Sequence, residues 1–88
     1  MTDRKLSPTE SKLLACLLVF YREIGPAATP GLKGGLEEES GLEMHELEEA
    51  VKELRDKGLI EYWELKPAVR LTREGLLLAR RLDGEEGG

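Results

Sequence analysis

The chemically active side chains of this chain gather in one short stretch that is rich in glutamate. We call this stretch the acidic face, and it consists of Glu43, His45, Glu46, Glu48 and Glu49. More glutamates occupy residues 37–39, and no lysine or arginine lies between Lys33 and Lys52. Because like charges repel, such a surface disfavours a polyanion and favours a cationic protein partner. The alternative is an ordinary solvated helix face, with ion pairs such as Glu48 with Lys52.

These residue types do not predict catalysis. His45 is the sole histidine and has no cysteine nearby, so the chain lacks the ligands of a zinc site. The hydroxyl groups at expected helix or turn boundaries are those of Ser7, Thr29, Ser40 and Thr72. Capping explains these hydroxyls better than a nucleophile paired with histidine does. We therefore expect no enzyme, no metal site and no cofactor.

A second set of residues could bind nucleic acid. We call it the hairpin patch, and it consists of Trp63, Lys66, Arg70 and Arg73. The cations could neutralise phosphates, and Trp63 could stack on a base or on Arg70. The alternative for Trp63 is that its partly exposed ring only covers the hairpin.

Helical signals should place the acidic face on the third of several helices. Ser7, Pro8 and Glu10 form a capping box that starts a first helix over residues 8–24. A cap and a proline at residues 29–30 predict a short second helix through about residue 39, weakened by two glycines. Apolar residues at helical spacing then predict a third helix over about residues 43–57, ended by Gly58.

The chain after Gly58 should form a short hairpin and a last helix. Residues 59–66 and 68–72 are rich in strand formers, and Pro67 prevents one continuous strand. A last helix should run from about residue 72 to about residue 83, followed by a frayed tail over residues 84–88. The single domain therefore spans residues 1–83.

The register of the hairpin decides which side chains face the core. With a turn centred on residues 66–67, one face should carry Ile60, Tyr62, Val69 and Leu71. The other face should carry Trp63, Leu65 and Arg70, so Trp63 should point away from the core.

This order of elements predicts a mainly α fold with a small β-hairpin, and its motifs resemble those of a known family. The similar segments are residues 36–42, the apolar positions Leu47, Val51 and Leu54, residues 57–60, and residues 71–75. They resemble the winged helix-turn-helix (helix-helix-helix-hairpin-helix) of the MarR family of transcriptional regulators. The resemblance covers about residues 6 to 82 and implies DNA binding with residues 43–49 on the recognition helix. The hairpin departs from the family because it lacks a long basic wing, and long dimerising terminal helices are absent too.

Composition favours a small soluble module. The 88 residues carry a formal net charge of −5 and a single cysteine, Cys16, within an apolar run. That run is too short to span a bilayer, and no disulfide can form within the chain, so we expect a cytoplasmic protein. The chain contains no asparagine or glutamine, a composition typical of proteins from thermophiles.

Surplus apolar residues on the first and last helices predict a homodimer, with a different protein as the alternative partner for the same surface. The predicted interface residues are Ala15, Cys16, Val19, Leu76 and Leu77. They lie outside the stripes expected to face the core, and a small monomer rarely exposes such a contiguous set.

Two functions follow as expectations. As a regulatory module the chain would bind duplex DNA, with the hairpin patch rather than the acidic helix supplying the main contacts. As an adaptor or accessory subunit it would dock a basic protein partner on the acidic face. The resemblance favours the first function, and the glutamates favour the second.

Overall fold

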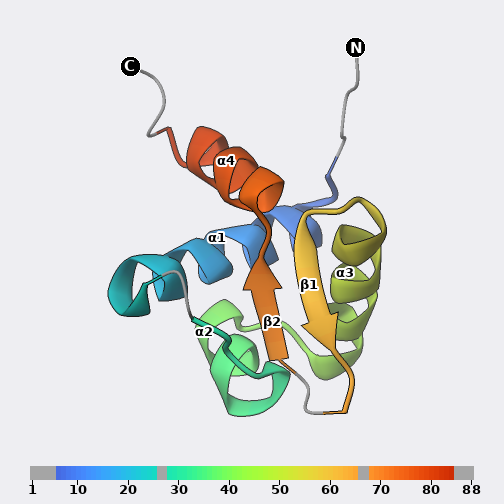
Figure 1. Ribbon diagram of the computed structural model, residues 1–88. Helices are drawn as coiled ribbons and strands as arrows, with labels where there is room; N and C mark the ends of the chain where they lie inside the picture. The colour runs from blue at the N-terminus through green and yellow to red at the C-terminus, as the bar shows by residue number, and fades with distance from the viewer. Residues whose placement is uncertain (1–5, 26–27, 66–67, 85–88) are drawn as a thin grey trace.

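A computed structural model describes residues 6–25, 28–65 and 68–84 of the chain. The helices are α1 (Pro8–Ile24), α2 (Glu37–Ser40), α3 (Met44–Asp56) and α4 (Arg73–Leu82), and α2 follows a wide turn, η1 (Leu32–Leu36). The strands β1 (Ile60–Trp63) and β2 (Ala68–Leu71) pair in an antiparallel hairpin. β1 runs beside α3, and α4 lies over α1 at the other end of the hairpin (Figure 1). The predicted mainly α architecture with a small β-hairpin is confirmed.

The first helix has the predicted bounds because its start is doubly capped. The N–H of Glu10 donates to Ser7 Oγ at 3.1 Å, and the N–H of Ser7 donates to Glu10 Oε1 at 3.0 Å. These two bonds satisfy backbone donors that a helix start otherwise leaves unpaired.

The second helix is shorter than predicted. Lys33 has an extended ψ of 128° and Gly34 a positive φ of 84°, so the backbone is not helical there. A single wide turn closes instead through the N–H of Leu36, which donates to the carbonyl of Gly31 at 2.9 Å. Regular helix begins only at Glu37, which shows that the two glycines outweigh the Thr29–Pro30 start signal.

The two faces of the hairpin carry the predicted side chains. Ile60 pairs with Leu71 and Tyr62 with Val69, so these side chains share the face toward the core, where Ile60 and Val69 are buried. Trp63 lies on the opposite face and is 42% exposed. The predicted turn at residues 66–67 lies outside the described residues.

An isolated β-bridge beside the hairpin was not predicted. Gly31 forms an antiparallel bridge with Ala68, and the N–H of Val69 donates to the carbonyl of Pro30 at 3.0 Å. The segment between α1 and η1 therefore pairs with β2 on the side away from β1.

The joint between the hairpin and α4 explains why Leu71 and Thr72 are followed, after two further residues, by Gly75. Thr72 Oγ1 accepts from the N–H of Gly75 at 3.0 Å, which caps α4, and donates to the carbonyl of Gly58 at 2.8 Å. A Cβ on Gly75 would overlap the carbonyl oxygen of Leu59. The glycine thus permits α4 to approach the chain that leads into β1.

A leucine-rich core joins all of these elements. Its fully buried members include Leu13, Leu14, Leu36, Leu47, Leu54 and Leu59. Burial of each such side chain contributes about 1.5–3 kcal/mol before the entropy cost of folding is counted. No helix within the described part of the chain is long and apolar enough to cross a membrane.

Candidate docking site on the third helix

The start of α3 uses some of the predicted acidic residues as caps. Glu46 Oε1 accepts from the N–H of Glu43 at 3.1 Å, and Glu43 Oε1 lies 3.4 Å from His45 Nδ1. Carboxylates near a helix N-terminus are stabilised by the helix dipole. Glu43 and Glu46 therefore have a structural role whether or not a partner binds.

All members of the acidic face remain accessible. Glu43, His45, Glu48 and Glu49 are exposed and Glu46 is half-buried. In the described part of the chain, no ion pair joins Glu48 to Lys52, in contrast to the ordinary solvated face considered above. The charges of Glu48 and Glu49 are therefore not neutralised by ion pairs within the described residues.

On one side, α3 borders a hollow beneath the start of α1. The hollow has a volume of about 420 Å³ and is lined by Ser7, Thr9, Glu10, His45, Glu46, Glu49, Ala50 and Glu53. We call it the acidic pocket, because Glu10, Glu46, Glu49 and Glu53 contribute carboxylates to it.

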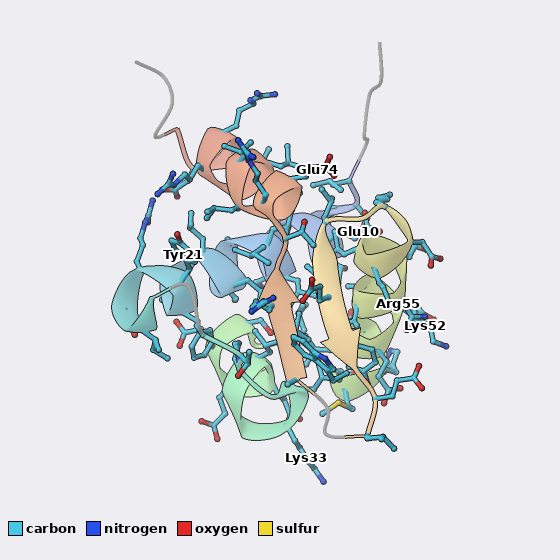
Figure 2. The ribbon with its side chains drawn as sticks, viewed as in Figure 1. Glu10, Tyr21, Lys33, Lys52, Arg55 and Glu74 are labelled. Atoms are coloured by element: carbon cyan, nitrogen blue, oxygen red, sulfur yellow. The ribbon has the colours of Figure 1, made fainter. Side chains whose placement is uncertain are left out.

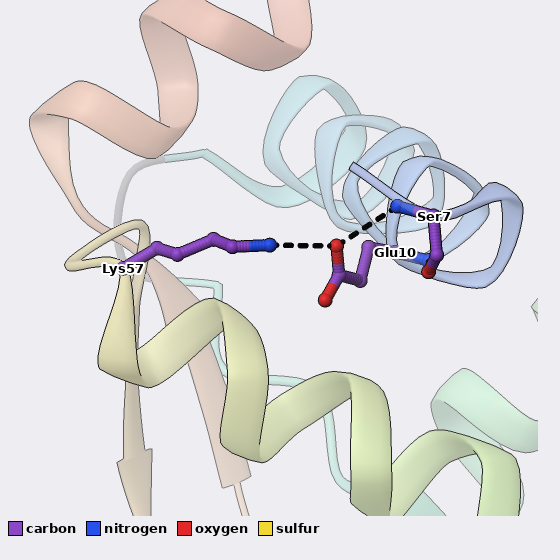
Figure 3. Close-up of polar contacts among 3 residues, drawn as sticks. All are labelled: Ser7, Glu10 and Lys57. Atoms are coloured by element: carbon purple, nitrogen blue, oxygen red, sulfur yellow. Dashed lines mark hydrogen bonds and ion pairs between the residues drawn. The ribbon is translucent and has the colours of Figure 1, made fainter. Parts of the chain in front are cut away.

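Glu10 is the buried member of the acidic pocket. Its residue is 2% exposed, and its Oε1 accepts from Lys57 Nζ at 2.9 Å in addition to the Ser7 N–H (Figure 3). Its other oxygen, Oε2, is buried without a hydrogen-bond partner among the described residues. Figure 3 shows that Oε2 points away from both Lys57 and Ser7 and toward α3. The carboxylate is thus satisfied on one oxygen only.

The ionisation of the Glu53 carboxyl depends on that of Glu10. Hydrogen bonding with Glu10, and then repulsion from the Glu10 charge, raises the pKa of the Glu53 carboxyl. Burial opposes ionisation of Glu10, but hydrogen bonds with Glu53, Lys57 and Ser7 outweigh it and lower the pKa of Glu10. A hydrogen bond between two carboxyl groups requires one of them to be protonated. When both are ionised, Oε2 of Glu10 therefore lacks a donor.

On its other side, α3 meets the hairpin through balanced charges. Arg55 Nη1 lies 3.3 Å from Glu64 Oε2, and its guanidinium stacks over the Tyr62 ring at 5.9 Å. Lys52 also projects from this part of α3 (Figure 2). The negative surplus of α3 is therefore concentrated on the side of the acidic pocket.

Part of the predicted hairpin patch comes together in the structure. The Arg70 guanidinium lies 5.7 Å from the centre of the Trp63 ring, as the register predicted. Arg70 Nη2 also pairs with Glu61 Oε1 at 3.0 Å, which neutralises much of its charge. Arg73 is exposed on the first turn of α4, and Lys66 lies outside the described residues. The described part of the patch therefore offers an aromatic platform, one arginine that is already paired, and Arg73, which makes no ion pair with another described residue.

The prediction is wrong for one of the five predicted dimer residues, Cys16, and the other four keep some exposed surface. Cys16 is only 7% exposed and packs in the core of its own chain, because α1 is covered on several sides by the other helices. Burial raises the pKa of its thiol. Ala15 is exposed, Val19 and Leu76 are half-buried, and Leu77 is 45% exposed. Cys16 is therefore unavailable to a second copy.

The α1 and α4 surface contains residues that the sequence did not single out. A hollow between these helices is lined by Ser11, Ala15, Ala79, Leu82 and Asp83. Leu82 is 53% exposed, because α4 turns Gly75 and Ala79 inward. Arg22 and Asp83 pair beside this surface at 2.8 Å.

Sequence reasoning missed Glu10 and Glu53 as site residues. The available signal for Glu10 was its place in the capping box, which accounts for one oxygen only.

Within the residues that the structure describes, no group of three or more His, Cys, Asp or Glu side chains is arranged to hold a metal ion. Comparisons of this chain with protein-family models, curated proteins and solved structures find no match.

Proposed function

We propose that this chain is a non-catalytic winged-helix module that binds a basic segment of another protein through α3. The observation that carries the proposal is the uncompensated acidity of α3 on the side of Glu49 and Glu53. The cations nearest the hairpin side, Arg55 and Arg70, are paired with Glu64 and Glu61. A basic partner would thus meet free carboxylates on this side of α3, whereas these two arginines are already paired and offer less to a polyanion.

The winged-helix assignment rests on the arrangement of the elements. Three helical segments precede a hairpin and a last helix, and the resemblance to the MarR family covers the same order. The isolated bridge between Gly31 and Ala68 also ties the segment between the first two helical segments to β2 of the hairpin. The assignment supports a binding role for α3, because the corresponding helix in a helix-turn-helix is the one presented to the partner.

Duplex DNA is the second candidate partner, favoured by the exposed stack of Arg70 on Trp63. Each approach of a glutamate to a phosphate at ~4 Å costs about 1 kcal/mol in water and more where water is excluded. Several such contacts would offset a large share of the roughly 4–10 kcal/mol that separates specific from non-specific DNA binding. DNA binding would therefore have to avoid α3 and depend on the hairpin patch.

Fluorescence anisotropy at low salt tests both partners together. A labelled peptide of alternating arginine and serine should bind the wild-type chain, and a short random-sequence duplex should not. The double variant Glu48→Lys plus Glu49→Lys should weaken peptide binding at least about tenfold, because two attractive charges become repulsive. Neither side chain caps a helix, so the fold should persist, which circular dichroism would check.

The matched control places the same charge change elsewhere. Glu23→Lys plus Glu74→Lys alters exposed residues of α1 and α4 and should reduce peptide affinity less than about threefold. Equal losses in both double variants would show that only net charge matters and would reject the acidic face as a site. Duplex binding that is lost in Arg70→Ala would reject the protein-docking function in favour of DNA.

A further inference from the structure

We infer that the acidic pocket between α1 and α3 receives one arginine side chain of the basic partner, whose guanidinium lies between Glu10 and Glu53. The inference rests on the proposed function and adds to it a defined binding site, the acidic pocket, which shares His45, Glu46 and Glu49 with the acidic face. Two independent features carry it, the unpaired buried oxygen of Glu10 and the hollow that this residue lines.

The first feature is an acceptor that has no donor among the described residues while Glu10 and Glu53 are both ionised. Buried polar atoms without a partner are rare because each loses its hydration without compensation. Glu10 Oε2 is such an atom, although Oε1 of the same carboxylate holds two donors. Because Oε2 has almost no accessible surface, an incoming N–H group would reach it once the Glu53 side chain turns aside, and the bond of Oε1 to Lys57 could remain.

The second feature is the shape and charge of the hollow. Glu49 and Glu53 line it from α3, and Glu10 lines it from α1. Lys57 approaches Glu10 at Oε1, and His45 and Glu46 also line the hollow. Among the described residues the carboxylates of the pocket outnumber the cation paired with them, so the pocket can accept one further positive charge.

The chemistry of the donors selects arginine over lysine. A guanidinium offers N–H groups along several edges of one plane, so it can bond to carboxylates from two helices at once. It is also more weakly hydrated than an ammonium group, which lowers the cost of leaving water. In the absence of a partner, a proton held between Glu53 and Glu10 would take the place of the guanidinium.

Binding of blocked pentapeptides, followed by NMR, tests the inference. The probes are Gly-Ser-Arg-Ser-Gly and two analogues in which lysine or citrulline replaces arginine. The arginine peptide should shift the amide signals of Ser7, Thr9, Ala50 and Glu53 saturably. The neutral citrulline peptide should leave these signals in place, and the lysine peptide should bind more weakly than the arginine peptide. A lysine peptide that binds as tightly would overturn the assignment of a guanidinium seat.

Matched variants inside and outside the pocket locate the site. Glu53→Gln removes a pocket charge and should weaken binding of the arginine peptide about tenfold. Glu23→Gln removes the same charge from an exposed position near the end of α1, outside the acidic face and the pocket, and should change affinity less than about twofold. Glu53 is exposed, so its variant should fold; Glu10→Gln is less suitable because it also breaks the pair with Lys57.

The outcomes separate this inference from the proposed function. If the longer basic peptide depends on Glu48 and Glu49 but Glu53→Gln has no effect, the pocket assignment is wrong and the docking function stands. If Glu23→Gln and Glu53→Gln weaken binding equally, only the net charge of the molecule attracts the peptide and the pocket site is again rejected. If neither the longer peptide nor the pentapeptide binds, both proposals fail.

Discussion

Glu10 combines two structural tasks in one carboxylate oxygen. It closes the cap of α1 and pairs with Lys57, which lies 47 residues further along the chain. The Glu10 side chain is 3% exposed and the Lys57 side chain 29%, so this ion pair is better shielded than the others described. Removing one partner of a shielded pair costs more than removing both, because the remaining charge loses its compensation.

At the residue scale, the Glu10 and Glu53 pair should make stability depend on pH in two directions. The lowered pKa of Glu10 stabilises the fold above the unfolded pKa, and this contribution is lost as pH falls through the folded value. The raised pKa of Glu53 stabilises the fold below the unfolded pKa, and this contribution is lost as pH rises through the folded value. The free energy of unfolding should therefore be highest between the two folded pKa values.

Urea unfolding followed across acidic and neutral pH would measure this profile. Glu53→Gln should remove the decline on the side of higher pH, because the amide cannot ionise. Glu10→Gln should remove the decline on the acidic side and lower the free energy of unfolding by about 1–3 kcal/mol near neutral pH. A Glu53→Gln profile identical to the wild-type profile would disprove the coupling.

At the element scale, caps and stops explain where the helices lie. The predicted bounds of α1 are confirmed because Ser7 and Glu10 are neighbours in sequence and cap the helix through local bonds. The end of α3 is confirmed for a similar reason, since Gly58 takes the positive φ of 75° that terminates it. The start of α2 was wrong because it depends on backbone conformation at Lys33 and Gly34, which capping signals do not describe.

Gly75 provides the sharpest test of how the elements fit together. Gly75→Ala should lower the free energy of unfolding by about 3 kcal/mol, because the new methyl group would overlap the Leu59 carbonyl and push α4 away. Helix propensity alone would predict a gain of roughly 1 kcal/mol from the same change. Thermal or urea unfolding distinguishes the two directions.

Gly35→Ala is the control for this experiment. A Cβ at Gly35 would meet Pro30 Cβ at 3.7 Å, which is ordinary van der Waals contact. The variant should therefore be neutral or slightly stabilising, by less than about 1 kcal/mol. A stable Gly75→Ala chain would show that α4 can shift without cost and that the joint does not position it.

At the scale of the whole molecule, charge and apolar surface are separated. The acidic pocket lies between α3 and the start of α1, whereas Leu77 and Leu82 are exposed on α4, and Leu82 lines a second hollow together with Ala15. This separation is compatible with a molecule that pairs through α1 and α4 and leaves α3 free for a partner. The homodimer remains a prediction, and its predicted interface no longer includes Cys16.

Analytical ultracentrifugation would test the dimer. The wild-type chain should sediment as a dimer, and Leu77→Glu plus Leu82→Glu should convert it to a monomer, because buried charges at an apolar interface are costly. Leu65→Glu is the control, since Leu65 is fully exposed on the hairpin and away from α4. A monomeric wild-type chain at high concentration would contradict the predicted interface.

The sequence alone determined those features that depend on near neighbours along the chain. Steric and hydrogen-bonding rules are local for residues that are close in sequence. Such residues account for the capping box at Ser7, the apolar spacing within α3, the stop at Gly58 and the side chains on each face of the hairpin. The glutamate surplus of residues 43–49 follows from composition in the same way. These local signals also predicted that Arg70 and Trp63 would share a face.

The tertiary structure decided the contacts between residues that are distant in sequence. It paired Glu10 with Lys57, bridged Gly31 to Ala68, buried Cys16 and brought Gly75 against Leu59. None of these follows from local preference, because each depends on how the helices pack around the common core. The unused oxygen of Glu10 belongs to this group, and the proposed seat for arginine therefore became visible only once the chain was folded.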